Sequence, residues 1–298
     1  MKVSSAGPSI TFLSIGYLGK GQDMSSAALE CAGPSKVAAR PTTARDQLYR
    51  VENSARQNCA DLARDFDMDK AEFDRFADEY QDQHRQSISI TGEFPEYFSE
   101  YKIRKLKKII TRNNLTVSTI CDFGSGIGNS IPFFQKHFPN AVLTSADVSQ
   151  RSLELSRVHY PSADHLLVIE NNIPVKDYSF DVTFSACVFH HIPSAEHVFW
   201  LRELHRVTRP GGLIAIFEHN ALNPLTVRAV NSCPFDVNAK LILATDLLRR
   251  LLDAGWTAPT VQYNVFFPRA LALLRPAEKY LHWLPLGAQY VVFARKGS

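Results

Sequence analysis

The feature that most constrains the fold is a run of three glycines at alternate positions, Gly124, Gly126 and Gly128. A short apolar segment ending in Asp122 precedes the run, and residues 129–138 follow it with apolar side chains at helical spacing. The glycines therefore mark a point where a buried strand turns tightly into a helix. Glycine permits a positive φ there and lets a ligand approach the main chain closely. The carboxylate before the run suits an ammonium or hydroxyl group held over the turn.

From about residue 117 the chain alternates between apolar runs and amphipathic segments, which predicts a mostly parallel sheet with helices on both faces. We expect strands at 118–122, 141–147, 165–170, 181–187, 213–218, 259–267 and 289–295. We expect helices at 97–111, 129–138, 149–159, 194–207, 240–254 and 269–282. A long insertion at about 220–240 separates the fifth strand from the next helix, and we expect it to form a lid.

Polar side chains follow five consecutive strands of this predicted sheet, where ligands of open α/β sheets bind. The residues at these strand ends are Asp122, Gly124 and Gly126; Asp147; Glu170, Asn171 and Asn172; His190 and His191; and Glu218, His219 and Asn220. The second acid, Asp147, lies about 20 residues beyond the glycines, where a ribose diol is usually bound. Alternatively, Asp147 caps the helix expected at 149–159.

Together these motifs resemble the S-adenosylmethionine-dependent methyltransferases of the Rossmann-like (class I) family, over roughly residues 60–296. The acid-x-Gly-x-Gly-x-Gly motif runs from Asp122 to Gly128, and an Arg-Pro-Gly-Gly turn stands at 209–212. The resemblance implies an α/β fold: a Rossmann-like doubly wound, mostly parallel seven-stranded sheet with an N-terminal helical cap. It also implies one antiparallel strand near the sheet edge. A nicotinamide dehydrogenase would more often carry Gly-x-Gly-x-x-Gly.

The resemblance implies S-adenosyl-L-methionine as the cofactor. The glycine turn would then hold its aminoacyl part, Asp147 both ribose hydroxyls, Val148 the adenine face, and Asn171 or Asn172 the adenine amino edge. The predicted cofactor-binding residues are Asp122, Gly124, Ser125, Gly126, Gly128, Asp147, Val148, Asn171 and Asn172.

Methyl transfer from a sulfonium is an in-line displacement by a substrate nucleophile, and a hydroxyl nucleophile benefits from a general base such as histidine. The predicted catalytic residues are His191, Glu218 and His219. For His190, packing or support of a neighbouring group is the favoured interpretation. The predicted substrate contacts are Tyr80, His84, Tyr101 and Asn220, of which the first three follow from the family's N-terminal helices.

The chain is expected to comprise a disordered tail at 1–44, a helical cap at 45–114 and the Rossmann-like catalytic domain at 115–298. A cleaved targeting peptide is the other interpretation of the tail. The 33 basic and 30 acidic residues give a net charge of +3, so no nucleic-acid partner is expected. No apolar run has the roughly 18–20 residues of a membrane span. Five cysteines without a Cys-x-x-Cys pair predict a reduced, cytoplasmic protein without a metal site.

The predicted function is methyl transfer from S-adenosylmethionine to a small molecule, with sugar, lipid-linked and secondary-metabolite acceptors all open. Oxygen, nitrogen and carbon also stay open as the methylated atom. The alternative is a non-catalytic partner subunit that binds the cofactor, because an intact glycine turn indicates binding alone.

Overall fold

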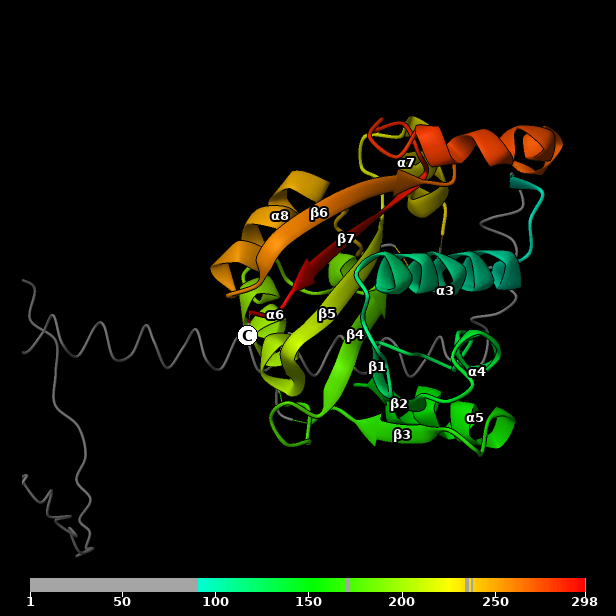
Figure 1. The fold of residues 1–298 in the computed structure, drawn as a ribbon. Coiled ribbons are helices and arrows are strands. Elements are labelled where there is room, and N and C mark those ends of the chain that lie inside the picture. Colours follow the sequence, from blue (N-terminus) through cyan, green and yellow to red (C-terminus); the bar gives the residue numbers. More distant parts are fainter. Residues whose placement is uncertain (1–90, 170–171, 234–235, 237, 298) are drawn as a thin grey trace, which may run out of the picture. The chain divides into compact units, whose positions relative to one another are not determined.

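The computed structural model describes residues 91–169, 172–233, 236 and 238–297, and a seven-stranded sheet runs through them (Figure 1). The strands are β1 (Thr119–Phe123), β2 (Val142–Asp147), β3 (Asp164–Leu167), β4 (Phe180–Ala186), β5 (Thr208–His219), β6 (Thr257–Asn264) and β7 (Gln289–Arg295). Their order is β3-β2-β1-β4-β5-β7-β6. Strand β7 runs antiparallel to β5 and β6, and all other neighbouring pairs are parallel. The predicted Rossmann-like, doubly wound sheet with one antiparallel strand is confirmed.

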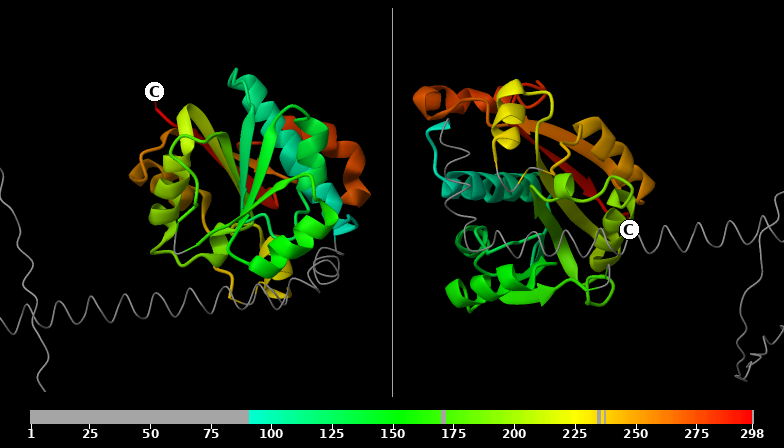
Figure 2. Two further views of the ribbon diagram at one scale, coloured as in Figure 1. Left: turned by 90° about the horizontal axis from the view of Figure 1, so that it is seen from below. Right: turned by 180° about the vertical axis from the view of Figure 1, so that it is seen from behind.

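Helices cover both faces of the sheet, as Figure 2 shows from two further sides. The α-helices are α3 (Pro95–Arg112), α4 (Ile131–His137), α5 (Gln150–His159), α6 (His197–Val207), α7 (Pro224–Asn231) and α8 (Ala244–Asp253). One hydrophobic core joins α6 and α8 to the sheet, and a second core joins α3 and α4 to its other face. Helix α5 lies against β2 and β3. Burial of these apolar faces is the main stabilising contribution to such a sandwich.

Helix α3 is part of this sandwich rather than a separate cap. Ile103, Leu106 and Ile110 recur at helical spacing and are buried against the sheet. Residues 45–90 of the predicted cap, which include Tyr80 and His84, lie outside the described residues, as does the tail at 1–44. The division of the chain into three parts therefore stays a prediction.

Two helical segments differ from the sequence-based expectation. The segment Arg269–Tyr280 forms a kinked 3₁₀-helix, because Pro276 cannot donate a main-chain hydrogen bond and Leu271 leaves helical geometry. The insertion contains α7, which the sequence analysis missed. Asn223 caps it by accepting from the N–H groups of Leu225 and Thr226, and Pro224 occupies its first turn.

Strand β5 begins earlier than the 213–218 expected, at Thr208. Across the part of the chain that the structure describes, no helix combines the length and the apolar character that crossing a bilayer requires.

Truncating a core leucine should separate buried from exposed positions. Leu201 on α6 is fully buried, whereas Leu273 is 96% exposed. We expect Leu201→Ala to lower the free energy of unfolding by about 2–5 kcal/mol, because the change leaves a cavity. Leu273→Ala, the same chemical change, should alter it by less than about 0.5 kcal/mol. Urea-induced unfolding measures both, and equal losses would contradict the assignment of this core.

Candidate active site

A cavity of about 430 Å³ opens at the carboxyl ends of β1, β2, β4 and β5. Strand β1 lies between β2 and β4, so this is where the strand order changes direction, the usual ligand position in such sheets. The sheet side of the lining comprises Phe123–Ile127, Asp147, Val148, Ala186–Val188, His190–Pro193 and His219. The opposite wall comes from the first half of α3, from α7 and from residues 265–268. Segments far apart in the sequence thus enclose one space.

The three glycines of the turn all have positive φ, +75°, +53° and +86° in chain order. They differ in how much space a side chain would have. A Cβ on Gly124 would lie 2.3 Å from Val188, and one on Gly128 would lie 2.4 Å from Ser156. These two positions exclude a side chain because the fold is close-packed there. A Cβ on Gly126 would meet no described atom within 4 Å. The main chain at Gly126, which lines the cavity, is therefore open to a ligand.

Asp147 ties the end of β2 to this turn. Its Oδ2 accepts a hydrogen bond from the N–H of Gly126 at 2.7 Å, and its Oδ1 accepts from Ser149 at 2.9 Å. Asp147 also lines the cavity. Ser149 is the N-cap of α5, accepting from the N–H of Ser152, so the helix-cap interpretation of Asp147 is wrong. A carboxylate in this place can accept further hydrogen bonds from a diol.

Asp122 lies behind the turn and is almost fully buried. Among the described residues its Oδ2 has no hydrogen-bond partner. Burial, and then the charge of Asp147, raise the pKa of Asp122 to about 7. Asp122 does not line the cavity, and a buried carboxylate oxygen without a donor is costly, so burial favours its protonated form.

Glu218 is buried at the end of β5 and does not line the cavity. Its Oε1 accepts from the N–H groups of Val188 (3.1 Å) and Phe189 (2.8 Å). Its Oε2 accepts from Nδ1 of His190 at 2.5 Å. All these partners belong to the loop after β4. The expectation that Glu218 meets the substrate is therefore corrected, because this carboxylate positions the loop.

The other two predicted catalytic residues, His191 and His219, both line the cavity. Burial and the charge of neighbouring His190 lower the pKa of His191. Both imidazoles come from loops or strand ends next to the glycine turn, so the structure brings together the groups that the sequence proposed for base and cofactor. Their catalytic roles stay predictions.

Three further cavity residues were missed by the sequence analysis: Lys102, Cys187 and Asp236. Lys102 Nζ lies 3.4 Å from Cys187 Sγ. Burial raises the pKa of Cys187, but Lys102 and His219 more than offset this and lower it to about 6. The position of Cys187 directly after a strand was the available sequence signal. Asp236 lies in the insertion, and no spacing pattern linked it to the site.

Several predicted site residues lie elsewhere. Asn220 is buried outside the cavity, and its amide donates to the carbonyls of Pro285 (3.1 Å) and Gly287 (2.8 Å), so it fixes a turn instead of facing a substrate. The hydroxyl of Tyr101 donates to Glu278 at 3.3 Å, also outside the lining. These two substrate assignments are therefore corrected.

Among the predicted cofactor residues, Asn172 is exposed and does not line the cavity, because its Oδ1 faces Arg206 at 3.4 Å. Its assignment to the adenine is corrected for this conformation. Asn171 lies outside the described residues, as do Tyr80 and His84. Val148 and Ser125 line the cavity, whereas Gly128 packs behind it.

Residues 121–216 match the sequence profile of a methyltransferase domain. A 98-residue segment is 33% identical to the 27-O-demethylrifamycin SV methyltransferase of Amycolatopsis mediterranei, and covers 30% of this chain and 35% of that protein. A 97-residue segment is 30% identical to the malonyl-[acyl-carrier protein] O-methyltransferase of Methylococcus capsulatus, and covers 32% of this chain and 34% of that protein. The chain thus spans about a third of the length of the curated relatives it matches.

A solved S-adenosylmethionine-dependent methyltransferase from Thermotoga maritima has the same fold, with a TM-score of 0.54 at 19% identity. The match covers 76% of this chain and 99% of that one. Residues 121–216 therefore match a methyltransferase domain, and the chain has the fold of this solved methyltransferase, in agreement with the family that its sequence motifs resemble. The predicted methyltransferase domain is thereby confirmed for residues 121–216, and S-adenosylmethionine is the cofactor that the sequence motifs imply.

The residues present fit this cofactor. The open main chain at Gly126 admits its methionine part, whereas Asp122, with its unpartnered Oδ2, lies outside the cavity lining. Asp147 and Val148 stand beside the turn for the ribose and adenine. When bound, the cofactor supplies an electrophilic methyl group.

Adding one methyl group at Gly126 should block the cofactor. We expect Gly126→Ala to raise the Kd for S-adenosylmethionine at least tenfold, because the new Cβ occupies the open side of the turn. Gly211→Ala is the matched control, since Gly211 has φ +73° and also no atom within 4 Å of a built Cβ, but lies outside the cavity. Both variants should lose about 1 kcal/mol of stability to backbone strain. Calorimetric titration measures the Kd, and equal affinities in the two variants would contradict this use of Gly126.

The raised pKa of Asp122 predicts a pH-dependent stability. Between its ordinary value of 3.8 and about 7, the folded protein holds a proton that the unfolded chain has lost. This group's contribution to stability therefore falls as pH rises through that window. In Asp122→Asn this decline should disappear.

Urea unfolding of wild type and variant at pH 5 and pH 8 isolates this effect, because all other titrating groups are shared. An identical change in stability between the two pH values in both proteins would show that Asp122 is not the group responsible.

Proposed function

We propose that the protein transfers a methyl group from S-adenosylmethionine to an oxygen atom of a small-molecule acceptor bound in the same cavity. The observation that carries this proposal is the shared space. The glycine turn and Asp147 form one part of its lining, and the imidazoles of His191 and His219 form another.

Alignment and exclusion of water are the protein's main tasks in such a displacement. The turn and Asp147 fix the donor from the sheet side. The first half of α3, α7 and residues 265–268 cover the opposite side. A donor and an acceptor enclosed between these walls react as one bound pair. The loss of translational and rotational entropy then occurs on binding and does not add to the barrier of the chemical step.

His219 is our candidate for the general base. It ends β5, lines the cavity and interacts with Cys187, which borders the same space. His191 is the second candidate, although its Nε2 lies 3.3 Å from Asp236. Glu218 acts through His190 and the loop after β4, without contact to the acceptor.

The wall opposite the sheet favours an acceptor with an apolar skeleton. Its residues include Leu225, Ala229, Val230, Phe266 and Pro268. Such a surface suits a lipid-linked molecule or a secondary metabolite better than a free sugar. Both curated relatives are named for methylation of oxygen, one on a rifamycin and one on a malonyl carrier protein, which supports oxygen as the methylated atom.

The decisive experiment supplies methyl-labelled S-adenosylmethionine and an apolar metabolite extract to the purified protein. The proposal expects release of S-adenosylhomocysteine and a labelled product whose mass rises by one methyl group. Binding of S-adenosylmethionine without any labelled product from apolar or polar extracts would instead support the non-catalytic partner subunit.

Replacing the base should slow the reaction without affecting the cofactor. We expect His219→Gln to lower kcat about a hundredfold or more, a size typical of general-base loss, with little change in the Kd for S-adenosylmethionine. His159→Gln, on the exposed side of α5, is the matched control and should retain wild-type kcat. Steady-state kinetics on the identified acceptor measure both. An unchanged kcat in His219→Gln would assign the proton transfer to another group.

A further inference from the structure

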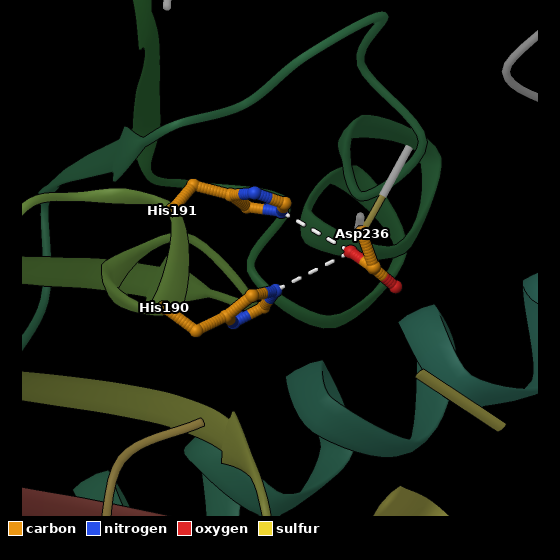
Figure 3. A group of neighbouring side chains, drawn as sticks. All are labelled: His190, His191 and Asp236. Carbon is orange, nitrogen blue, oxygen red and sulfur yellow. Dashed lines mark ion pairs between the residues drawn. The ribbon is translucent and has the colours of Figure 1, made fainter. Parts of the chain in front are cut away.

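We propose that His190, His191 and Asp236 form a binding site for a divalent transition-metal ion of the zinc type on the wall of this cavity. Figure 3 shows the three side chains converging, with both imidazoles directed at the same carboxylate. The histidines belong to the short 3₁₀-helix after β4 (Phe189–His191), and Asp236 follows α7. This site departs from the sequence-based expectation of no metal, which rested on cysteine spacing alone.

The two spacings between Asp236 and the imidazole nitrogens match those around a tetrahedral ion. Asp236 Oδ1 lies 3.3 Å from His191 Nε2 and 3.6 Å from His190 Nε2. Ligands placed about 2.0–2.2 Å from a tetrahedral zinc ion are about 3.3–3.6 Å from one another. One ligand atom from each residue falls within 4.8 Å of the others. The contact between His190 and Asp236 is too long for a hydrogen bond; its length fits an ion pair with a protonated His190 and equally a metal ion held between the two groups.

A second observation, independent of spacing, comes from the far side of His190. Its Nδ1 donates to Glu218 Oε2 at 2.5 Å, and the other carboxylate oxygen accepts main-chain N–H groups from Val188 and Phe189. When a metal ion takes the place of the second proton on His190, this bond holds the neutral tautomer whose Nε2 carries the lone pair. That lone pair faces Asp236. A carboxylate that orients a histidine in this way is the usual support of a histidine bound to metal.

The charges of the cluster also favour a cation. Glu218 and Asp236 are both buried, and their side chains are 1% and 7% exposed. Two buried carboxylates need positive charge nearby. A proton on His190 supplies one unit, and a divalent ion supplies two. Two imidazoles and one carboxylate suit zinc, iron, cobalt or nickel, whereas magnesium and calcium prefer oxygen ligands throughout.

Three protein ligands leave a fourth position of a tetrahedral ion for another molecule. All three residues line the cavity, so that position faces the acceptor space. An acceptor oxygen bound there would lose its proton more readily, as metal-bound water does. This role in methyl transfer rests on the proposed function, whereas the binding site stands without it.

Zinc titration of chelator-treated full-length protein tests the site, with calorimetry for zinc and visible absorption for cobalt as a reporter of geometry. We expect one ion per chain. His191→Gln and Asp236→Asn should each raise the zinc Kd about a hundredfold. Glu218→Gln should raise it about 10–100-fold, through loss of support for His190. The matched controls are His159→Gln, at an exposed position, and Asp246→Asn, whose side chain is 42% exposed; both lie outside the cavity and should bind zinc as wild type does.

Failure to bind zinc in the wild type, or equal affinity in variants and controls, would overturn the site and leave a proton on His190 as the balancing charge. Titration of the same samples with S-adenosylmethionine keeps the two proposals apart. Intact cofactor binding in His191→Gln and Asp236→Asn shows that these variants are folded. Loss of cofactor binding in the wild type would count against the proposed function alone.

Discussion

The site depends on one kind of interaction, used twice: an acid at the end of one strand accepts hydrogen bonds from the loop that follows its neighbour. Asp147, at the end of β2, accepts from Gly126 in the turn after β1. Glu218, at the end of β5, accepts from Val188 and Phe189 in the loop after β4. Each loop is thus fixed from the adjacent strand. A parallel sheet makes this arrangement available because all its carboxyl ends lie at one edge.

The two acids, Asp147 and Glu218, differ in their surroundings, and therefore in whether they can also bind a ligand. Asp147 lines the cavity and can still accept from a ligand, whereas Glu218 is buried and directs all its bonds to the protein. The cost of burying Glu218 is offset by main-chain donors and by His190. That pairing in turn orients His190 toward Asp236. A structural anchor therefore also determines which imidazole nitrogen faces the cavity, and this links the loop's stability to its chemistry.

Much of the fold followed from local patterns. The glycine turn, the strand periods and the acids at strand ends predicted the sheet and the place of its ligand site. Glu218 and His219 show the limit of this reasoning. Both end β5, but neighbouring residues of a strand point to opposite faces, so only one of them could meet the acceptor. Sequence alone gave no reason to choose His219. Asn220 and Tyr101 were assigned wrongly for a similar reason, because their hydrogen-bond partners lie far along the chain.

The sequence by itself determined the doubly wound sheet and the glycine turn, because periodicity, glycine conformation and acids at strand ends each depend on only a few neighbouring residues. Only the tertiary structure decided which polar groups share one space. Asp236 reaches His190 and His191 from the insertion after β5, and Lys102 reaches Cys187 from α3. Such contacts form between segments that are distant in the sequence, because the packing of the whole core brings them together. A local sequence pattern depends only on neighbouring residues and therefore does not predict them.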